Sequence, residues 1–358
     1  MTSALIDASL ASTIGRRLAP AGPSVSATDA RAAVTMLREL AGEAEHLVAG
    51  ITGMQAGAGH SAVVVDRGDW IDSNVESLEY LLSSWTPRKE PSKLSREVGS
   101  RTLAVQVGMS LSWLSTKVLG QYEVFSSNHS GRLLLVAPNI VDVEQLLNVD
   151  ARDFRLWVCL HEETHRVQFG ANPWLVEYLR ELIVGFLEAS DVPPQELAKQ
   201  FASTLRRDAA KPPTSLTDTP HSNHSVSGSS WFERLQNAEQ QFLYNQITAV
   251  MSLLEGHADV VMDEVGPQVV KTLPQIRAKF QDRRTNPSTL DRIVRSALGM
   301  DAKLRQYSDG AKFVRHVVDA VGMQGFNRVW ESPETLPTRT ELHAPDLWLA
   351  RTGVQAVA

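Results

Sequence analysis

Apolar residues recur at helical spacing along most of this 358-residue chain, and this periodicity restricts the possible folds more than any other feature. Residues 28–50 are the clearest case, because they are rich in Ala and Leu and have Thr28 or Asp29 available as a cap. The same spacing predicts helices over residues 94–120, 173–189, 194–208 and 231–265, and with breaks to about residue 322. No unit of about 20 to 50 residues repeats, so a solenoid is excluded.

Short apolar runs predict a few strands beside these helices. Residues 61–70 open with three valines and close at Arg67 and Gly68, and residues 132–138 follow a glycine and end at a proline. The last part of the chain, residues 331–353, holds three prolines and is expected to cover the surface in extended and turn conformations. The predicted fold is therefore mainly α (α+β), with a small β-sheet.

A change of composition divides the chain. Residues 209–230 are rich in Pro, Ser, Thr and Gly, and such a segment cannot bury enough apolar area to offset its ordering entropy. We therefore expect an N-terminal segment (1–27), a first helical part (28–208), a flexible insertion (209–230) and a C-terminal helical part (231–358).

Overall composition excludes several classes of protein. Apolar residues make up 43% and charged residues 21%, and the formal charge of −6 gives no reason to expect a nucleic-acid partner. Cys159 is the only cysteine, which excludes an internal disulfide and a multi-cysteine zinc site, so any metal would be held by His and carboxylate. The sequence has neither a signal-peptide pattern nor an apolar run of about 18 residues, and a cytoplasmic protein without membrane association is expected.

The run HEETH at residues 161–165 lies within one of the helical patterns. Phe154, Trp157, Val158, His161 and His165 stand at i, i+3, i+4, i+7 and i+11, so both histidines continue the apolar face and point inward. Histidines one helical turn apart can both bring a ring nitrogen to zinc, while the Glu at 162 lies about a quarter-turn away, near a bound water. We predict zinc ligation by both histidines and a catalytic role for that glutamate. The motif alone is also compatible with an amphipathic helix carrying two core or surface histidines.

A second cluster lies in LLEGHADVVMDE, where Glu255 and Asp259 are one helical turn apart. Glu255 would complete a two-His, one-Glu donor set, and Asp259 could accept the second imidazole N–H of a ligand histidine. His257 is an alternative third ligand, but it projects about 200° from Glu255 around the helix and is better interpreted as a capping or core residue. Gly256 would allow another helix to approach closely. Both carboxylates could instead belong to a solvated helix face.

With these residues in view, the sequence resembles the gluzincin pattern, HExxH followed by ExxxD, and more closely the actinobacterial zincin-like metallopeptidase type 2 family, formerly a domain of unknown function. The matching blocks span about residue 51 to the C-terminus: ITGMQAGAG, VLGQYEVF, VAPNI, DFRLWVCLHEETHRVQF, PWL, LLEGHADVVMDEVGP, DAKLRQYSDGAKFV and VWESPETLP. The resemblance implies a mostly helical zincin-like fold and a zinc hydrolase, part of the family being associated with biosynthesis of a deazaflavin coenzyme. It implies no particular substrate. The 90 residues from His165 to Glu255 exceed the separation in compact gluzincins.

These patterns predict hydrolysis of a peptide or small amide, in which Glu162 takes a proton from a zinc-activated water and delivers it to the leaving amine. Tyr307, Arg305 and His316 could stabilise the oxyanion, although packing is the commoner fate of such residues and none is assigned. The alternative function is a catalytically silent zinc-binding scaffold or partner-binding protein. Glu162 argues against it, because a structural site needs no carboxylate beside its histidines. A metal-free helical protein remains possible only if the two clusters do not meet in the fold.

Overall fold

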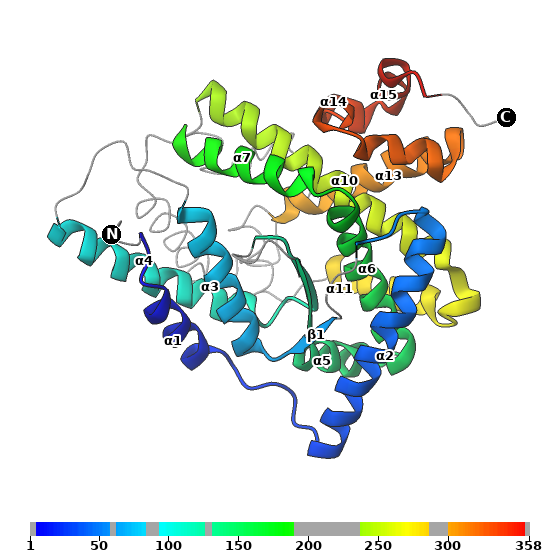
Figure 1. Ribbon diagram of the computed structural model, residues 1–358. Coiled ribbons are helices and arrows are strands. Elements are labelled where there is room, and N and C mark those ends of the chain that lie inside the picture. Colours follow the sequence, from blue (N-terminus) through cyan, green and yellow to red (C-terminus); the bar gives the residue numbers. More distant parts are fainter. Residues whose placement is uncertain are drawn as a thin grey trace, which may run out of the picture.

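The computed structural model describes residues 5–57, 62–83, 93–125, 131–189, 237–285 and 300–354. The fold is mainly helical with one small sheet, as predicted (Figure 1). The helices are α1 (Ala8–Leu18), α2 (Ala27–Thr52), α3 (Arg67–Ser83), α4 (Lys93–Leu114), α5 (Ala137–Leu147), α6 (Ala151–Ala171), α7 (Trp174–Glu188), α10 (Ala238–Val269), α11 (Leu273–Thr285), α13 (Met300–Phe326), α14 (Arg339–His343) and α15 (Pro345–Thr352). Two short 3-10 helices, η1 (Asn327–Trp330) and η2 (Pro333–Thr335), join α13 to α14.

The sheet has three strands in the order β1-β3-β2. Strand β1 (Val63–Val65) pairs in parallel with β3 (Arg132–Val136), placing Val63 opposite Leu134. Strand β2 (Gly120–Glu123) pairs antiparallel with the other side of β3, placing Gly120 opposite Leu135. Strand β3 is therefore central, and Leu133 to Val136 are almost completely buried. Strand β2 forms an edge of the described sheet and contacts α6.

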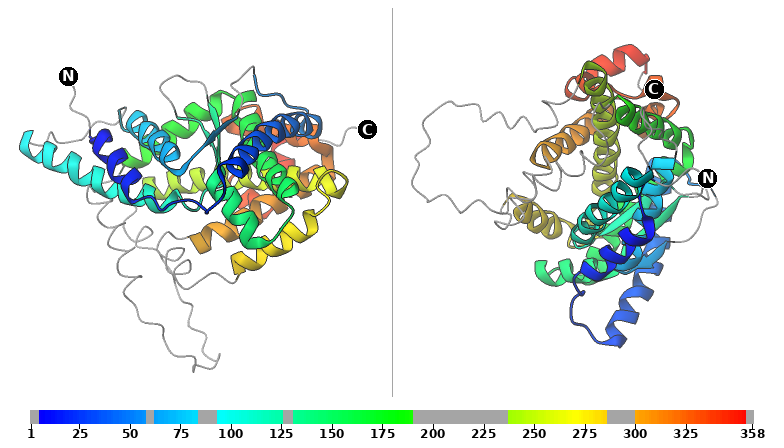
Figure 2. Two further views of the ribbon diagram at one scale, coloured as in Figure 1. Left: turned by 90° about the horizontal axis from the view of Figure 1, so that it is seen from below. Right: turned by 90° about the vertical axis from the view of Figure 1, so that its left-hand side faces the viewer.

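Helix α6 is the central element of the molecule and packs between α2 and α10 (Figure 1). Asp150 caps its first turn by accepting a hydrogen bond from the backbone N–H of Asp153. The helix is buried around nearly its whole circumference, which is typical of a helix inside a core. One hydrophobic cluster lies on its α2 side, and a second lies among α7, α10, α13 and the C-terminal helices. A third cluster joins α1, α3 and α4 to β3, on the N-terminal side of the molecule (Figure 2).

Helices α10 and α13 cross at very short range. A Cβ atom added at Gly256 would collide with the backbone of Gly310 and Ala311, and one added at Gly310 would collide with the backbone of Ser252. The close helix approach predicted at Gly256 is thus present, and its partner is α13. Because α10 also packs against α6, this crossing joins the HEETH helix to the C-terminal part of the chain.

Several predicted boundaries differ from the structure. Helix α2 begins at Ala27 with Ser26 as its cap, so the proposed caps Thr28 and Asp29 were wrong. The strand predicted over residues 61–70 ends at Val65, because the Asp66 side chain accepts the backbone N–H of Asp69 and starts α3. The helix predicted over residues 94–120 ends at Leu114, and β2 follows it.

The extended conformation predicted for residues 331–353 was also wrong, since this stretch contains η2, α14 and α15. Pro333 and Pro345 stand in the first turn of their helices, where a missing N–H leaves no hydrogen bond unmade. Thr338 and Glu341 form a capping box that starts α14. Residues 194–208 and 209–230, predicted as a helix and an insertion, lie outside the described residues.

Candidate metal centre

Two helices bring the three predicted metal ligands together. His161 and His165 lie one turn apart on α6, and their Nε2 atoms are 3.1 Å from each other. Glu255 projects from α10, with one carboxylate oxygen 3.7 Å from His161 Nε2 and the other 3.8 Å from His165 Nε2. One donor atom from each residue lies within 4.8 Å of the other two. The two sequence clusters, 90 residues apart, therefore meet at one point.

The spacing and chemistry of these donors fit zinc. Tetrahedral ligands at roughly 2.0–2.1 Å from zinc lie about 3.3 Å from each other, close to the three distances observed. Two imidazole nitrogens and one carboxylate are a typical catalytic donor set, which leaves a fourth position for water or substrate. The three side chains are 30%, 13% and 25% exposed, so the site is partly open to solvent.

Gln168, which the sequence analysis did not identify, fixes one of the histidine rings. Its Oε1 lies 2.9 Å from His165 Nδ1, and its Nε2 lies 2.9 Å from the Leu254 carbonyl oxygen and 3.0 Å from His257 Nδ1. The spacing would have allowed its detection, since Gln168 follows His165 by three residues and lies on the same helix face.

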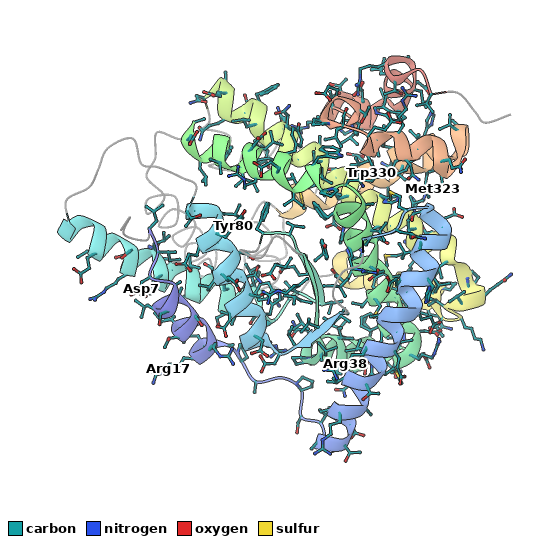
Figure 3. The ribbon with its side chains drawn as sticks, viewed as in Figure 1. Asp7, Arg17, Arg38, Tyr80, Met323 and Trp330 are labelled. Carbon is teal, nitrogen blue, oxygen red and sulfur yellow. The ribbon has the colours of Figure 1, made fainter. Side chains whose placement is uncertain are left out.

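His257 is a core residue, as expected, and the structure gives it a contact to the metal centre through Gln168. Its ring is completely buried and lies 5.1 Å from Phe326 and 5.5 Å from Trp330, measured between ring centroids. Figure 3 labels Trp330 on the side of the molecule that carries α10 and α13. Burial, assisted by the nearby His165, lowers the pKa of His257 to about 3, so its ring is neutral at physiological pH.

Glu162 is a buried carboxylate that lacks an ionic partner. Its side chain lies against Gly120 at the start of β2, where an added Cβ would be 2.5–2.8 Å from the glutamate's Cγ, Cδ and Oε1. The neighbouring Glu163 is equally buried but pairs with Arg166, which also binds Glu45. Within the described ranges, Glu162 has neither a hydrogen bond nor an ion pair. Burial, and then the charge of Glu255, raise the pKa of Glu162 well above its usual value.

Asp259 lies one turn beyond Glu255, but its carboxylate is 42% exposed and faces two arginines. It lies 3.3 Å from Arg277 of α11 and 3.3 Å from Arg315 of α13, and Asp263 pairs with the same two side chains. The predicted role as acceptor for a ligand imidazole was wrong for His165, whose Nδ1 contacts Gln168. For His161 that role stays a prediction.

The three oxyanion candidates lie on α13, and His316, whose side chain is described, makes no contact with the candidate metal ligands in the described ranges. His316 Nε2 lies 2.8 Å from Asp346 of α15, in an exposed pair on the surface. The side chains of Arg305 and Tyr307 are outside the described part of the chain.

A family model described as "Zincin-like metallopeptidase" matches residues 6–349. The chain belongs to this family. As a member of this family it has the fold expected from its sequence, and membership implies zinc binding at a site for which the three converging donors are candidates. No helix in the described ranges is both long and apolar enough to cross a bilayer.

One solved structure is similar over almost the whole of this chain. It is a protein from Chloroflexus aurantiacus that is provisionally described as a hydrolase with a novel fold. The two share 30% sequence identity and a TM-score of 0.64, over 98% of this chain and 100% of the other. A comparison with curated proteins finds no match.

Proposed function

We propose that this chain is a zinc-dependent hydrolase that cleaves a peptide or small amide, with His161, His165 and Glu255 as zinc ligands and Glu162 as general base. The observation that carries the proposal is the unpaired, buried Glu162 beside three donors at zinc spacing. When bound there, zinc lowers the pKa of water towards ~7 and polarises a carbonyl oxygen.

Each of the four residues would then have a distinct role. The two histidines and Glu255 hold the ion and leave one position open, while Glu162 remains free to move a proton. A buried carboxylate without a partner is unfavourable for stability, and the neighbouring Glu163 shows the usual solution, an ion pair with arginine. Burial raises the pKa of Glu162 and so disfavours its ionised form. A divalent cation bound nearby would favour the ionised form, which explains how an unpaired carboxylate can be accommodated there.

Glu162→Gln tests this proposal directly. The amide keeps the shape of the side chain but cannot accept the proton, so turnover should fall by about 10²–10⁴-fold while zinc content stays near one per chain. Zinc is measured by mass spectrometry and turnover with a library of peptides and small amides. Glu163→Gln is the matched control, since it removes an equally buried carboxylate from the same helix and should lower stability without affecting turnover.

Two outcomes would overturn the proposal. Full zinc occupancy in His161→Ala would show that the ligand set is different. If zinc is bound but neither the wild type nor the Glu163→Gln control hydrolyses any member of the library, the chain is a zinc-binding scaffold and not a hydrolase.

A further inference from the structure

Gln168 lies within hydrogen-bond distance both of the predicted ligand His165, on its own helix, and of two groups on α10, the helix that carries Glu255. It is completely buried, and all its contacts have ordinary hydrogen-bond lengths. Its two partners on α10, Leu254 and His257, stand immediately before Glu255 and two residues after it.

The directions of these hydrogen bonds follow from one fixed acceptor. The Leu254 carbonyl oxygen can only accept, so the Gln168 atom facing it is the amide nitrogen. The same nitrogen therefore donates to His257 Nδ1, and Gln168 Oε1 must accept from His165 Nδ1. His165 thus carries its proton on Nδ1, which leaves the lone pair of Nε2 directed at Glu255 and His161.

The position of His257 makes this arrangement rigid. Its ring packs against Phe326 and Trp330, which also contact each other, and its Nε2 has no hydrogen-bond partner within the described ranges. In the neutral ring the proton is on Nε2, since Nδ1 accepts from Gln168. The aromatic rings of Phe326, at the end of α13, and Trp330, in η1, are thereby connected, through His257 and Gln168, to the ring of His165.

We propose that Gln168 is the positioning residue of the metal centre, and that His257 anchors it. The proposal rests on the proposed zinc site and gives Gln168 two effects. Gln168 selects the His165 tautomer that can bind metal, and it fixes the distance between α6 and Glu255. His257 is then a part of the site without being a ligand, which explains a fully buried histidine two residues from Glu255.

Gln168→Met tests the first effect, because methionine fills a similar volume without any of the three hydrogen bonds. Chelator competition should show zinc bound 10- to 100-fold more weakly, the usual range for loss of a group that orients a ligand. Gln240→Met is the matched control: Gln240 is also buried, in the capping box of α10, a full 15 residues before Glu255. It should lower the melting temperature and leave zinc affinity unchanged. Equal zinc affinities in Gln168→Met and wild type would overturn the proposal.

Two substitutions at His257 test the anchor. His257→Asn can place an amide oxygen near the position of Nδ1 and should retain most of the zinc affinity. His257→Phe keeps the aromatic packing but offers Gln168 no acceptor, and should weaken zinc binding. If the two variants bind zinc equally, His257 acts only through packing and the anchor is wrong.

The tautomer of His165 gives a readout that needs no metal. In zinc-free protein, long-range proton–nitrogen NMR should show His165 protonated on Nδ1 in the wild type and a shift towards Nε2 protonation in Gln168→Met, with the signal assigned from His165→Ala. An Nε2-protonated His165 in the wild type would refute the proposal. Failure of the wild type to bind zinc would refute the proposed function alone, since the tautomer measurement still decides the role of Gln168.

Discussion

At the scale of single residues, the most restrictive contact at the site is between Glu162 and Gly120. Strand β2 fixes Gly120 by pairing it with Leu135 of the buried central strand, so the backbone there has little freedom to retreat. Glu162 lies on the rigid, buried helix α6 and fills the space where any side chain at position 120 would begin. Position 120 requires glycine because any larger side chain would overlap the side chain of Glu162. The position of the Glu162 carboxylate therefore depends on Gly120.

Gly120→Ala should therefore displace the glutamate carboxylate and reduce turnover by about 10²-fold, the effect of a misplacement of about 1 Å. Zinc content should remain near one per chain, because the three heavy atoms nearest an added Cβ all belong to Glu162 and none to a proposed ligand. The measurement is turnover per zinc ion. In the double variant Gly120→Ala, Glu162→Gln, activity should equal that of Glu162→Gln alone, since the base is already lost. A further large loss in the double variant would show that the alanine acts elsewhere.

At the scale of helices, Glu255 owes its position to the contact between α10 and α13. The backbones touch at Gly256 and Gly310, directly beside the carboxylate that faces His161 and His165. Four charged side chains, Asp259 and Asp263 with Arg277 and Arg315, join α10 to α11 and α13 one to two turns further on. Gly256, Asp259 and Asp263 stand at i, i+3 and i+7, so the helix that carries the third ligand is held against α13 along one face.

Gly256→Ala should force α10 and α13 apart and destabilise the protein by about 1–3 kcal/mol, as overpacking does. Because Glu255 moves with its helix, zinc affinity should fall as well. Gly42→Ala is the matched control, since Gly42 lies in the middle of α2 with nothing within 4 Å of an added Cβ. It should stabilise the protein by roughly 0.5–1 kcal/mol through helix propensity. Denaturant unfolding measures both changes, and a Gly256→Ala protein as stable as Gly42→Ala would refute the close contact.

The parts of the fold that the sequence predicted are those specified by local patterns. Spacing within one helix was enough to place His161 and His165 on one face, and the periodicity of α2, α7 and α10 located those helices. Features that depend on distant residues were missed: the partners of Gln168 lie 86 and 89 positions away. Strand β2 carries no alternating pattern of its own and is specified by pairing with β3. The ion pairs of Asp259 could not be predicted for the same reason, because Arg277 and Arg315 come from other helices.

At the scale of the whole molecule, the candidate metal centre lies where two hydrophobic clusters meet. Helix α6 belongs to the cluster with α2 and β3, whereas the middle of α10 belongs to the cluster with α7 and α13. An ion bound by His161, His165 and Glu255 would connect the two clusters, in addition to the connection that Gln168 makes through hydrogen bonds. Zinc should then stabilise the entire fold and not only the site.

Removal of zinc by a chelator should therefore lower the melting temperature of the wild type. Binding to the folded state alone contributes RT ln(1 + [Zn]/Kd), about 2.7 kcal/mol when free zinc is 100 times Kd. Since 1 kcal/mol shifts the transition of a 150–250-residue protein by roughly 2–4 °C, the expected change for this longer chain is a few degrees. Gln168→Met should show a smaller shift at the same free zinc, because its Kd is higher, and His161→Ala should show none. Scanning calorimetry with and without chelator measures all three, and an equal shift in His161→Ala and the wild type would mean that the stabilising ion binds elsewhere.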